Sequence, residues 1–231
     1  MKVRAYLLDV ARFQQEPMAE GHEFCRLCER LSQERQQKIG RFRYAKGKAL
    51  SLGAGLLLDF GLSQYGLRER DAAIEYGADG KPYLRDFPEL HFNLSHSGSL
   101  AMAVFADREA GCDIEQAAVP DMRVAYRFFS ADEVKMLEGL EKEKQAEVFF
   151  RFWTLKESFL KVTGKGTRMP LNEFCIHLGT PVKVEYGGKF LDYGFAEYAY
   201  PGYRAALCVE KPEGRAFKGA KPELLSWEQI R

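Results

Sequence analysis

The sequence has no long hydrophobic run and no excess of one charge. No stretch approaches the ~20 consecutive apolar residues that a membrane-spanning helix needs, so we expect no membrane partner. The 34 Lys and Arg residues balance 33 Asp and Glu residues, for a formal net charge of +1, and this favours neither nucleic acid nor a membrane surface. The first residues carry Arg4 and Asp9 inside a short apolar run and do not resemble a secretory signal.

Cysteine is scarce and scattered. The five cysteines are an odd number, which indicates reduced thiols rather than a disulfide framework and predicts a cytoplasmic protein. His22, Cys25 and Cys28 form a single Cys-x-x-Cys pattern without a second pair, which is weak evidence for zinc. Residues three apart share a helical face and cysteine packs well as a small apolar side chain, so we interpret them as packing residues.

Apolar and aromatic residues are plentiful. They make up 46% and 13% of the 231 residues, enough to bury a sizeable core. Periodicity and turn signals predict the order strand, helices, strands twice, with the change near residue 110, although no residue-level repeat is visible. The sequence therefore predicts an α+β fold of two halves, 1–109 and 110–231. The cleft between the halves is the expected ligand site.

Turn and capping residues set the expected ends of the elements. The helical blocks cover about 18–60 and 121–163, and the expected strands are 3–9, 74–76, 90–94, 100–106, 111–115, 174–178, 182–186, 190–198 and 203–210. Ser32 is expected to break or cap the first block, and Gly61 to end it. Ser130-Ala-Asp-Glu133 is a capping-box pattern, and Gly164 is expected to end the last helix. The polar segment Ser95–Ser99 is expected to be a turn.

Asp113-Ile-Glu115 is the first candidate for chemistry. On a strand, residues two apart point to the same face, so both carboxylates project together while Ile114 enters the core. Two such carboxylates repel unless a cation lies between them, and hard oxygen ligands suit Mg²⁺. The alternative is an edge strand with a solvated acidic face, and these three residues alone favour that alternative.

A second candidate lies in the aromatic helix around residues 149–161. Its broad apolar surface indicates substantial burial, and it is formed by Phe149, Phe152, Trp153, Phe159 and Leu160. Lys156, Glu157 and Lys161 lie within the same helix. Because Glu157 and Lys161 are four residues apart, they could also be an ordinary surface ion pair worth about 0.3–0.5 kcal/mol.

Two further segments carry polar or cationic residues whose role the local pattern alone leaves open. Phe92-Asn-Leu-Ser-His-Ser-Gly98 offers hydroxyls, the His96 imidazole and a glycine that permits close backbone approach, although such residues also make ordinary turns. Between Arg26 and Lys48 there are eight Lys or Arg residues and two Glu. A cationic stripe is plausible there, and so is a solvated helix face. No aromatic RNA-binding signature accompanies this segment.

The order and spacing of these motifs are more specific than any one of them. Asn93-Leu-Ser-His-Ser97, then Gly111-Cys-Asp-Ile-Glu115, then Trp153-Thr-Leu-Lys-Glu-Ser158 with Lys161 resembles the Sfp-type 4′-phosphopantetheinyl transferases. The similarity extends to Gly80-Lys-Pro82 and Arg127-Phe-Phe-Ser130, so it covers nearly the whole chain. The resemblance implies a monomer of that fold, with two pseudo-symmetric halves that are small, mostly antiparallel sheets packed with helices and hold coenzyme A between them.

The resemblance also implies an activity and its site. The enzyme would move the 4′-phosphopantetheine arm of coenzyme A to a serine of an apo acyl- or peptidyl-carrier protein, release 3′,5′-ADP and depend on Mg²⁺. Asp113, Glu115 and Glu157 would hold the metal, as the chemistry of phosphoryl transfer requires. The serine proton would go to Glu157 or to a metal-bound water, and the sequence leaves this choice open.

Cationic and polar residues would hold coenzyme A. Lys161 would contact the pyrophosphate with Lys156 as a helper, and Ser95 and His96 would hydrogen-bond to phosphate groups. The remaining expected contacts are Arg35 and Lys38 at the 3′-phosphate, and Ser51 and Lys81 at the nucleotide pocket.

The sequence departs from the family pattern in the basic segment. Where the family usually has an acidic residue and then an arginine, this chain has Gly47 and Leu50. A coenzyme A-binding protein without transfer activity is one alternative function. Another is a different Mg²⁺-dependent enzyme such as a nucleotide hydrolase, although the chain lacks a Walker-type phosphate loop.

Overall fold

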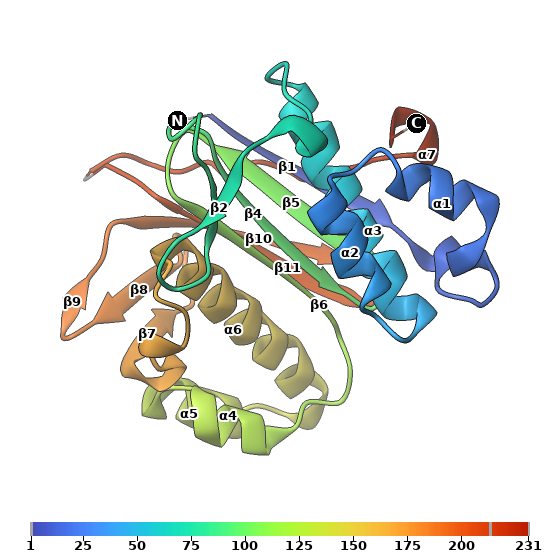
Figure 1. The fold of residues 1–231 in the computed structure, drawn as a ribbon. Coiled ribbons are helices and arrows are strands. Elements are labelled where there is room, and N and C mark those ends of the chain that lie inside the picture. Colours follow the sequence, from blue (N-terminus) through green and yellow to red (C-terminus); the bar gives the residue numbers. More distant parts are fainter. Residues whose placement is uncertain (1, 213, 231) are drawn as a thin grey trace.

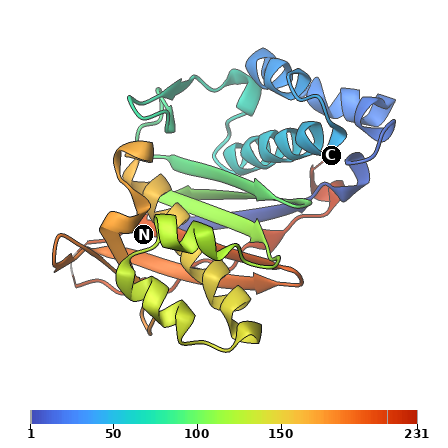
Figure 2. The ribbon, with the colours of Figure 1, turned by 90° about the horizontal axis from the view of Figure 1, so that it is seen from below.

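The computed structural model describes residues 2–212 and 214–230 and shows a layered α+β protein. Two of its sheets pack face to face, and each is covered on its outer side by a long helix (Figures 1 and 2). One sheet has the strand order β12-β1-β5-β4 and carries helix α3. The other has the order β10-β11-β6 and carries helix α6.

Strands and helices are each numbered in the order in which they occur along the chain. The strands are β1 Val3–Asp9, β2 Ile74–Tyr76, β3 Pro82–Leu84, β4 His91–Ser97, β5 Leu100–Ala106, β6 Ala110–Gln116, β7 Phe174–His177, β8 Lys183–Tyr186, β9 Lys189–Phe190, β10 Tyr193–Tyr200, β11 Tyr203–Glu210 and β12 Glu223–Leu224. The helices are α1 His22–Cys28, α2 Gln33–Gly40, α3 Ala45–Ser63, α4 Met122–Phe128, α5 Ala131–Glu138, α6 Lys142–Thr163 and α7 Trp227–Ile230.

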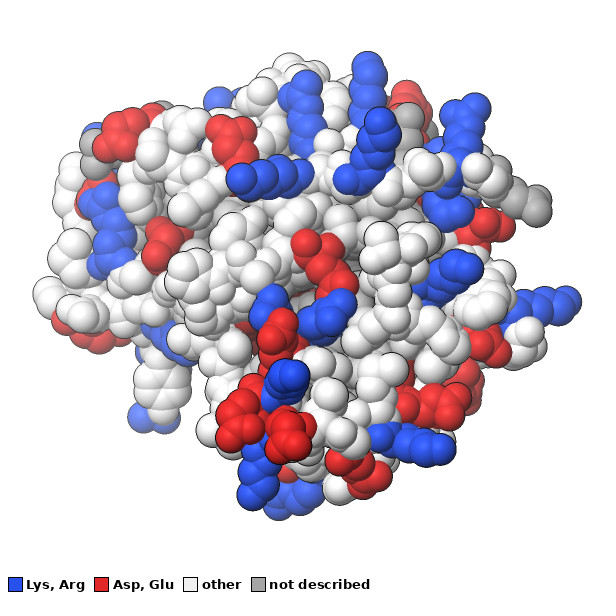
Figure 3. All heavy atoms as spheres, turned by 180° about the vertical axis from the view of Figure 1, so that it is seen from behind, with Lys and Arg blue, Asp and Glu red and all other residues white. Residues whose placement is uncertain are grey.

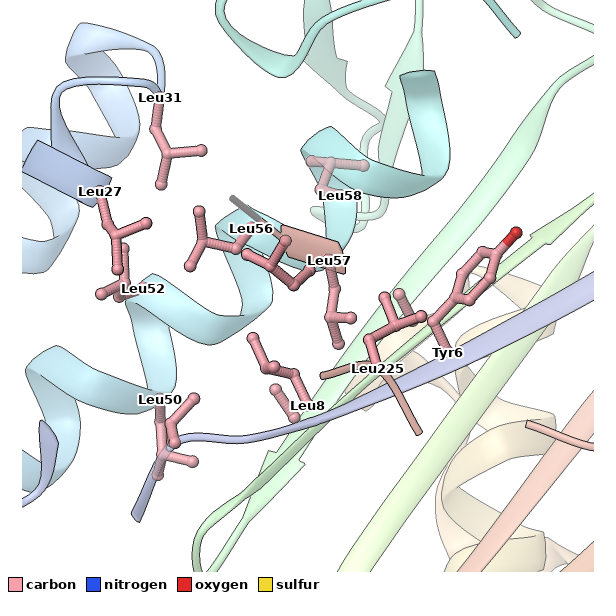
Figure 4. Packing of buried hydrophobic residues seen from close by; sticks show 14 of the residues in the cluster. Tyr6, Leu8, Leu27, Leu31, Leu50, Leu52, Leu56, Leu57, Leu58 and Leu225 are labelled. Carbon is pink, nitrogen blue, oxygen red and sulfur yellow. The ribbon is translucent and has the colours of Figure 1, made fainter. Parts of the chain in front are cut away.

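Strand β1 is buried on both faces because it lies between two cores. Tyr6 and Leu8 point toward the leucine-rich helix α3 (Figure 4). Ala5 and Leu7 point the other way, into the core between the two packed sheets. Such continuous burial explains why this strand reads as an apolar run rather than an alternating one. Strand β12 pairs with β1 in parallel, so residues near the C-terminus complete the first sheet.

Helix α6 is buried against the second sheet. Phe152 and Phe159 are fully buried there, in a core that also contains strands β7 and β8. The helix packs most closely on β6 and β11. This contact places one turn of α6 beside the strand that carries Asp113 and Glu115.

Gly111 permits that close contact. A Cβ atom at this position would lie 2.2 Å from the carbonyl oxygen of Ser158 and 2.6 Å from the backbone nitrogen of Val162. Both atoms belong to the helix backbone and cannot rotate away, so any side chain would force α6 off β6.

We therefore expect Gly111→Ala to destabilise the protein by about 1–3 kcal/mol, the usual cost of overpacking a core. Urea unfolding measures this effect. Gly40→Ala is the matched control, because nothing lies within 4 Å of a Cβ atom there. Equal stability of Gly111→Ala and the unmutated protein would contradict the close packing.

The sequence predicted the fold class correctly, and several boundaries as well. Ser130 and Glu133 form the capping box, Ser32 caps α2 through its side chain, and Gly164 ends α6 in the left-handed conformation, with φ of 66°. The expected end at Gly61 is wrong. Helix α3 runs on to Ser63, and Gly61 instead makes room for the Phe105 ring, which would lie 1.9 Å from a Cβ atom.

The turn predicted at Ser95–Ser99 begins later in the structure than the sequence indicates. Strand β4 continues to Ser97, so Ser95 and His96 are strand residues paired with β5, and only the residues around Gly98 turn. The division into halves at 109/110 stays a prediction. Among the described residues, no helix is both long enough and apolar enough to cross a membrane.

Charges on the surface are mixed. On the face seen in Figure 3, lysine and arginine are interspersed with aspartate and glutamate, as expected for a chain with a formal net charge of +1.

Candidate active site

A cavity of about 550 Å³ lies where the two helix-covered sheets meet. One wall comes from α2, α3 and the β2–β3 hairpin, and the other from β6 and α6, with β4 between them. Nine of the eleven residues predicted to form the site line this cavity: Arg35, Lys38, Ser51, Ser95, His96, Asp113, Glu115, Glu157 and Lys161.

The acidic wall brings together three carboxylates from distant parts of the chain. Asp113 and Glu115 share one face of β6, and Glu157 comes from the turn of α6 that packs on this strand. Burial raises the pKa of Glu157 above its ordinary value of 4.5, and the nearby Asp113 and Glu115 raise it further. Burial likewise raises the pKa of Glu115, with repulsion from Asp113 adding to it. The three carboxylates of this wall therefore repel one another, and a nearby positive charge would stabilise them.

Lys161 supplies part of that charge. Its ammonium group donates to Asp113 Oδ1 at 2.6 Å, to Ser95 Oγ at 3.1 Å and to the carbonyl oxygen of Cys112 at 3.1 Å. Burial lowers the pKa of Lys161, but attraction to Asp113 and its neighbours outweighs burial and raises it. Because an ammonium has three donors, Lys161 acts on a ligand in this arrangement through its charge rather than through a further hydrogen bond.

The acidic wall suits a divalent cation in its chemistry. The Oδ2 atom of Asp113 is buried and has no hydrogen-bond partner, and a buried carboxylate oxygen without a partner is costly unless a ligand satisfies it. Three carboxylates are the hard oxygen donors that Mg²⁺ takes. Within residues 2–212 and 214–230, no three or more His, Cys, Asp or Glu side chains are already gathered as a coordination cage.

The opposite wall is basic. Arg35 and Lys38 are one turn apart on α2 and both face the cavity. Burial lowers the pKa of Lys38, and the neighbouring Arg35 lowers it further. Burial also lowers the pKa of His96, as do the charges of Lys161, Lys38 and Arg35. These charges disfavour the protonated imidazole of His96.

Glu69, a buried carboxylate that the sequence analysis did not single out, supports the basic wall. Glu69 accepts from the backbone nitrogen of Ser32 at 2.6 Å and from its hydroxyl at 2.9 Å, and lies 3.8 Å from the Arg35 guanidinium. It anchors the first turn of α2, where Ser32 caps the helix. No local pattern marks Glu69, because its partners lie more than 30 residues away.

The structure does not bring two predicted residues to the cavity. Lys156 is fully buried on the other side of α6, where its ammonium donates to both oxygens of Glu133, at 2.9 and 2.7 Å, and to the carbonyl of Phe174 at 2.8 Å. On a helix, residues 156 and 157 point about 100° apart, so the two cannot share the cavity. The expected role of Lys156 as a helper at the pyrophosphate is wrong.

Lys81 is the second. Its side chain bonds to Glu109 and to the carbonyl oxygen of Val162, at the end of α6. Its neighbours Gly80 and Pro82 do line the main cavity, while Lys81 itself borders a separate, smaller one of about 360 Å³. The hairpin between β2 and β3 therefore reaches the site, but its lysine fastens the hairpin to α6.

Ser51 and Ser95 differ in what they offer a ligand. The Ser51 hydroxyl is buried beside the cavity and its hydrogen-bonding capacity is unused. The Ser95 hydroxyl donates to Asp113 Oδ1 at 2.8 Å. A hydroxyl has one proton to donate, so in this arrangement Ser95 supports the acidic wall instead of donating to a phosphate.

Aromatic rings complete the cavity. Phe42, Tyr76, Phe92 and Trp153 line it, and the sequence assigned none of them a contact. Phe42 lies over the first turn of α3, where it occupies the space that a side chain at Gly47 would need. Tyr76 could not be found from the sequence, because its position depends on the β2–β3 hairpin folding toward α2.

Fold and cavity together define a class of protein: an α+β enzyme with a basic wall and a carboxylate wall facing one cleft, suited to a polyphosphate substrate and a divalent cation. Two family models match the chain. The model of the 4′-phosphopantetheinyl transferase superfamily matches residues 109–208, and that of the N-terminal part of 4′-phosphopantetheinyl transferases matches residues 16–107.

Curated relatives agree with the family models. The 4′-phosphopantetheinyl transferase Sfp of Bacillus subtilis is 33% identical over 187 residues, covering 79% of this chain and 84% of the relative. The 4′-phosphopantetheinyl transferase HetI of a Nostoc species is 36% identical over 163 residues, covering 67% of this chain and 69% of the relative. The chain belongs to the 4′-phosphopantetheinyl transferase family and is a transferase.

A solved structure, the holo-[acyl-carrier-protein] synthase of Thermotoga maritima, is only distantly similar. It is 18% identical with a TM-score of 0.35, over 45% of this chain and 64% of that chain.

Proposed function

We propose that the protein transfers the 4′-phosphopantetheine arm of coenzyme A to a serine of an apo acyl- or peptidyl-carrier protein and releases 3′,5′-ADP. The observation that carries the proposal is one cavity with three carboxylates and Lys161 on one wall and Arg35 and Lys38 on the other. We further propose that the protein acts as a monomer in the cytoplasm, with the halves 1–109 and 110–231 contributing the two walls.

In this proposal each wall handles one part of coenzyme A. Arg35 and Lys38 bind the 3′-phosphate, with Ser51 and His96 as further hydrogen-bonding groups. Asp113, Glu115 and Glu157 would hold Mg²⁺, which would supply positive charge against the pyrophosphate and the leaving group. Lys161 contributes its positive charge near the same oxygens.

The transfer step exchanges one bond for another. The carrier serine oxygen attacks the phosphorus that bears the pantetheine arm, and the bond from that phosphorus to the bridging oxygen of 3′,5′-ADP breaks. The serine proton passes to Glu157. Phosphoryl transfer depends mainly on positioning and charge stabilisation, so opposed basic and acidic walls are the required arrangement.

Mass spectrometry tests the proposal directly. Apo-carrier protein incubated with coenzyme A, Mg²⁺ and this protein should gain the mass of one phosphopantetheine arm, with 3′,5′-ADP released only when the carrier is present. Binding of coenzyme A without any mass gain, across a panel of apo-carriers, would instead indicate a coenzyme A-binding protein without transfer activity.

Arg35→Ala should raise the KM for coenzyme A. The side chain is mostly buried beside the cavity, and a charged hydrogen bond to phosphate contributes about 1.5–3 kcal/mol, so we expect an increase of about tenfold or more with a smaller change in kcat. Arg41→Ala is the matched control, because Arg41 caps the far end of α2 and does not line the cavity. An unchanged KM in Arg35→Ala would remove Arg35 from the site.

A further inference from the structure

The two packed sheets meet along a polar seam between β4 and β6. Strand β4 pairs through its backbone with β5, and β6 pairs with β11, so β4 and β6 do not form a ladder with each other. Instead, side chains of β4 accept hydrogen bonds from the backbone of β6. Asn93, Ser95 and Ser97 accept the backbone N–H groups of Cys112, Ile114 and Gln116, at 3.0, 3.4 and 3.1 Å.

The spacing of the seam follows from strand geometry. Alternate residues of a strand point to the same side, so residues 93, 95 and 97 all face β6 and meet every second N–H group along it. The residues between those N–H groups are Asp113 and Glu115. The seam therefore runs directly behind the carboxylates of the cavity.

Each seam hydroxyl then donates to one of these carboxylates. Ser95 donates to Asp113 Oδ1 at 2.8 Å, and Ser97 donates to Glu115 Oε2 at 2.7 Å. A serine hydroxyl accepts through its lone pairs and donates one proton. Because the N–H of Gln116 occupies the acceptor side of Ser97, the hydroxyl proton is directed to Glu115.

Ser97 is held firmly and lies outside the cavity. The Ser95 oxygen is also bonded to Lys161, which is part of the site, whereas Ser97 is not among the residues that line the cavity. The turn that follows it is anchored: the Tyr203 hydroxyl accepts from the Ser99 backbone nitrogen at 2.8 Å, and Gln14 donates to the carbonyl of Gly98 at 2.7 Å. Gly98 has φ of 59° and lies against Tyr203 and Gln116, where a side chain would not fit.

We infer that Ser97 is a positioning residue, which fixes the Glu115 carboxylate at the cation end of the cavity without touching the substrate. The inference rests on the proposed function for what Glu115 binds. A hydrogen bond that orients a ligating carboxylate restricts it to one direction, so less freedom is lost when the cation binds. Ser97 thus joins the two halves at the seam and sets the direction of one metal ligand.

The experiment compares three variants by cation binding and by transfer. Ser97→Ala removes the donor, Ser97→Thr keeps a hydroxyl on a β-branched residue that suits a strand, and Ser99→Ala alters a serine of the same turn that contacts no carboxylate. Mn²⁺ binding is measured by electron paramagnetic resonance with coenzyme A present and no carrier. The Mg²⁺ concentration for half-maximal transfer is measured separately.

Removing an outer partner of a metal ligand typically weakens metal affinity 10–100-fold. We expect Ser97→Ala to weaken Mn²⁺ binding and raise the half-maximal Mg²⁺ concentration about tenfold. The KM for coenzyme A at saturating Mg²⁺ should stay within about twofold. Ser97→Thr should recover most of the affinity, and Ser99→Ala should match the unmutated protein.

Two results would overturn the inference. One is equal Mn²⁺ affinity in Ser97→Ala and the unmutated protein. The other is a loss in Ser97→Ala that Ser97→Thr does not recover while both variants melt at the same temperature. If the unmutated protein transfers no arm to any carrier, the proposed function fails, and the Mn²⁺ comparison still decides the role of Ser97.

Discussion

Glu157→Gln should reduce transfer of the phosphopantetheine arm at least about 100-fold, the usual minimum loss for a group that moves a proton or holds a catalytic metal. The substitution keeps the size of the side chain and removes its charge. Glu157 faces the cavity and not the core, so the protein should fold normally. The rate is measured at saturating coenzyme A and Mg²⁺. Glu143→Gln, an exposed position near the start of the same helix, should leave the rate unchanged.

The same variant should be at least as stable as the unmutated protein in the absence of divalent cations. The pKa of Glu157 is raised in the folded state above its ordinary 4.5, so the folded state binds more protons than the unfolded state above that pH. Its contribution to the free energy of unfolding therefore falls as the pH rises from about 4.5 through the raised pKa. Glutamine has no such cost.

Unfolding by urea in EDTA at pH 5 and pH 7.5 measures this difference. We expect the stability of Glu157→Gln relative to the unmutated protein to be greater at pH 7.5 than at pH 5. A variant that keeps a near-normal rate, or whose stability relative to the unmutated protein is lower at pH 7.5 than at pH 5, would show that Glu157 is not the buried, repelled carboxylate of the site.

Lys156→Met should destabilise the protein by about 3–5 kcal/mol, the cost of removing one partner of a buried ion pair. Lys156 has no exposed surface and Glu133 is 1% exposed. Burial lowers the pKa of Lys156, and Glu133 opposes that shift. Without the ammonium, Glu133 keeps the backbone nitrogens of Ser130 and Ile176 as donors, at 2.8 and 2.7 Å, but its charge stays buried.

Urea unfolding measures the effect, with Lys142→Met at the exposed first residue of the same helix as control. Adding Glu133→Gln should recover part of the loss, because glutamine removes the buried charge and its single amide oxygen can still accept the Ser130 N–H of the capping box. Folded Lys156→Met should have a normal KM for coenzyme A. A KM raised tenfold at unchanged stability would return Lys156 to the site.

The seam between β4 and β6 explains why some predictions succeeded. The alternation Asn93, Ser95, Ser97 and the pair Asp113, Glu115 are read as two separate motifs, yet in the structure they are bonded residue by residue. Strand periodicity alone places the carboxylates on one face. The partner strand is a tertiary fact, which is why Ser95 looked like a turn residue and Ser97 had no visible role.

Lys156 and Lys81 show where prediction from the sequence failed, because neither of them lines the cavity. Both are cations inside or beside recognisable motifs. Helical spacing places Lys161, and not Lys156, on the same face as Glu157, but the sequence does not say which face meets the cavity. Lys156 lies on the side of α6 that faces Phe174 and not the cavity. The side chain of Lys81 is bound to the carbonyl oxygen of Val162 at the end of α6. These depend on which face of a helix packs against which strand.

The sequence by itself determined the α+β class, the capped ends of α2, α5 and α6, and the residue types needed for a divalent cation and phosphates, because periodicity, capping and charge are local properties. Only the tertiary structure decided which charged groups face the cavity and which ones brace it. That choice depends on contacts such as Gly111 against Ser158 of α6 and Glu69 against Ser32 at the start of α2. These contacts join residues 47 and 37 positions apart, which no local pattern encodes.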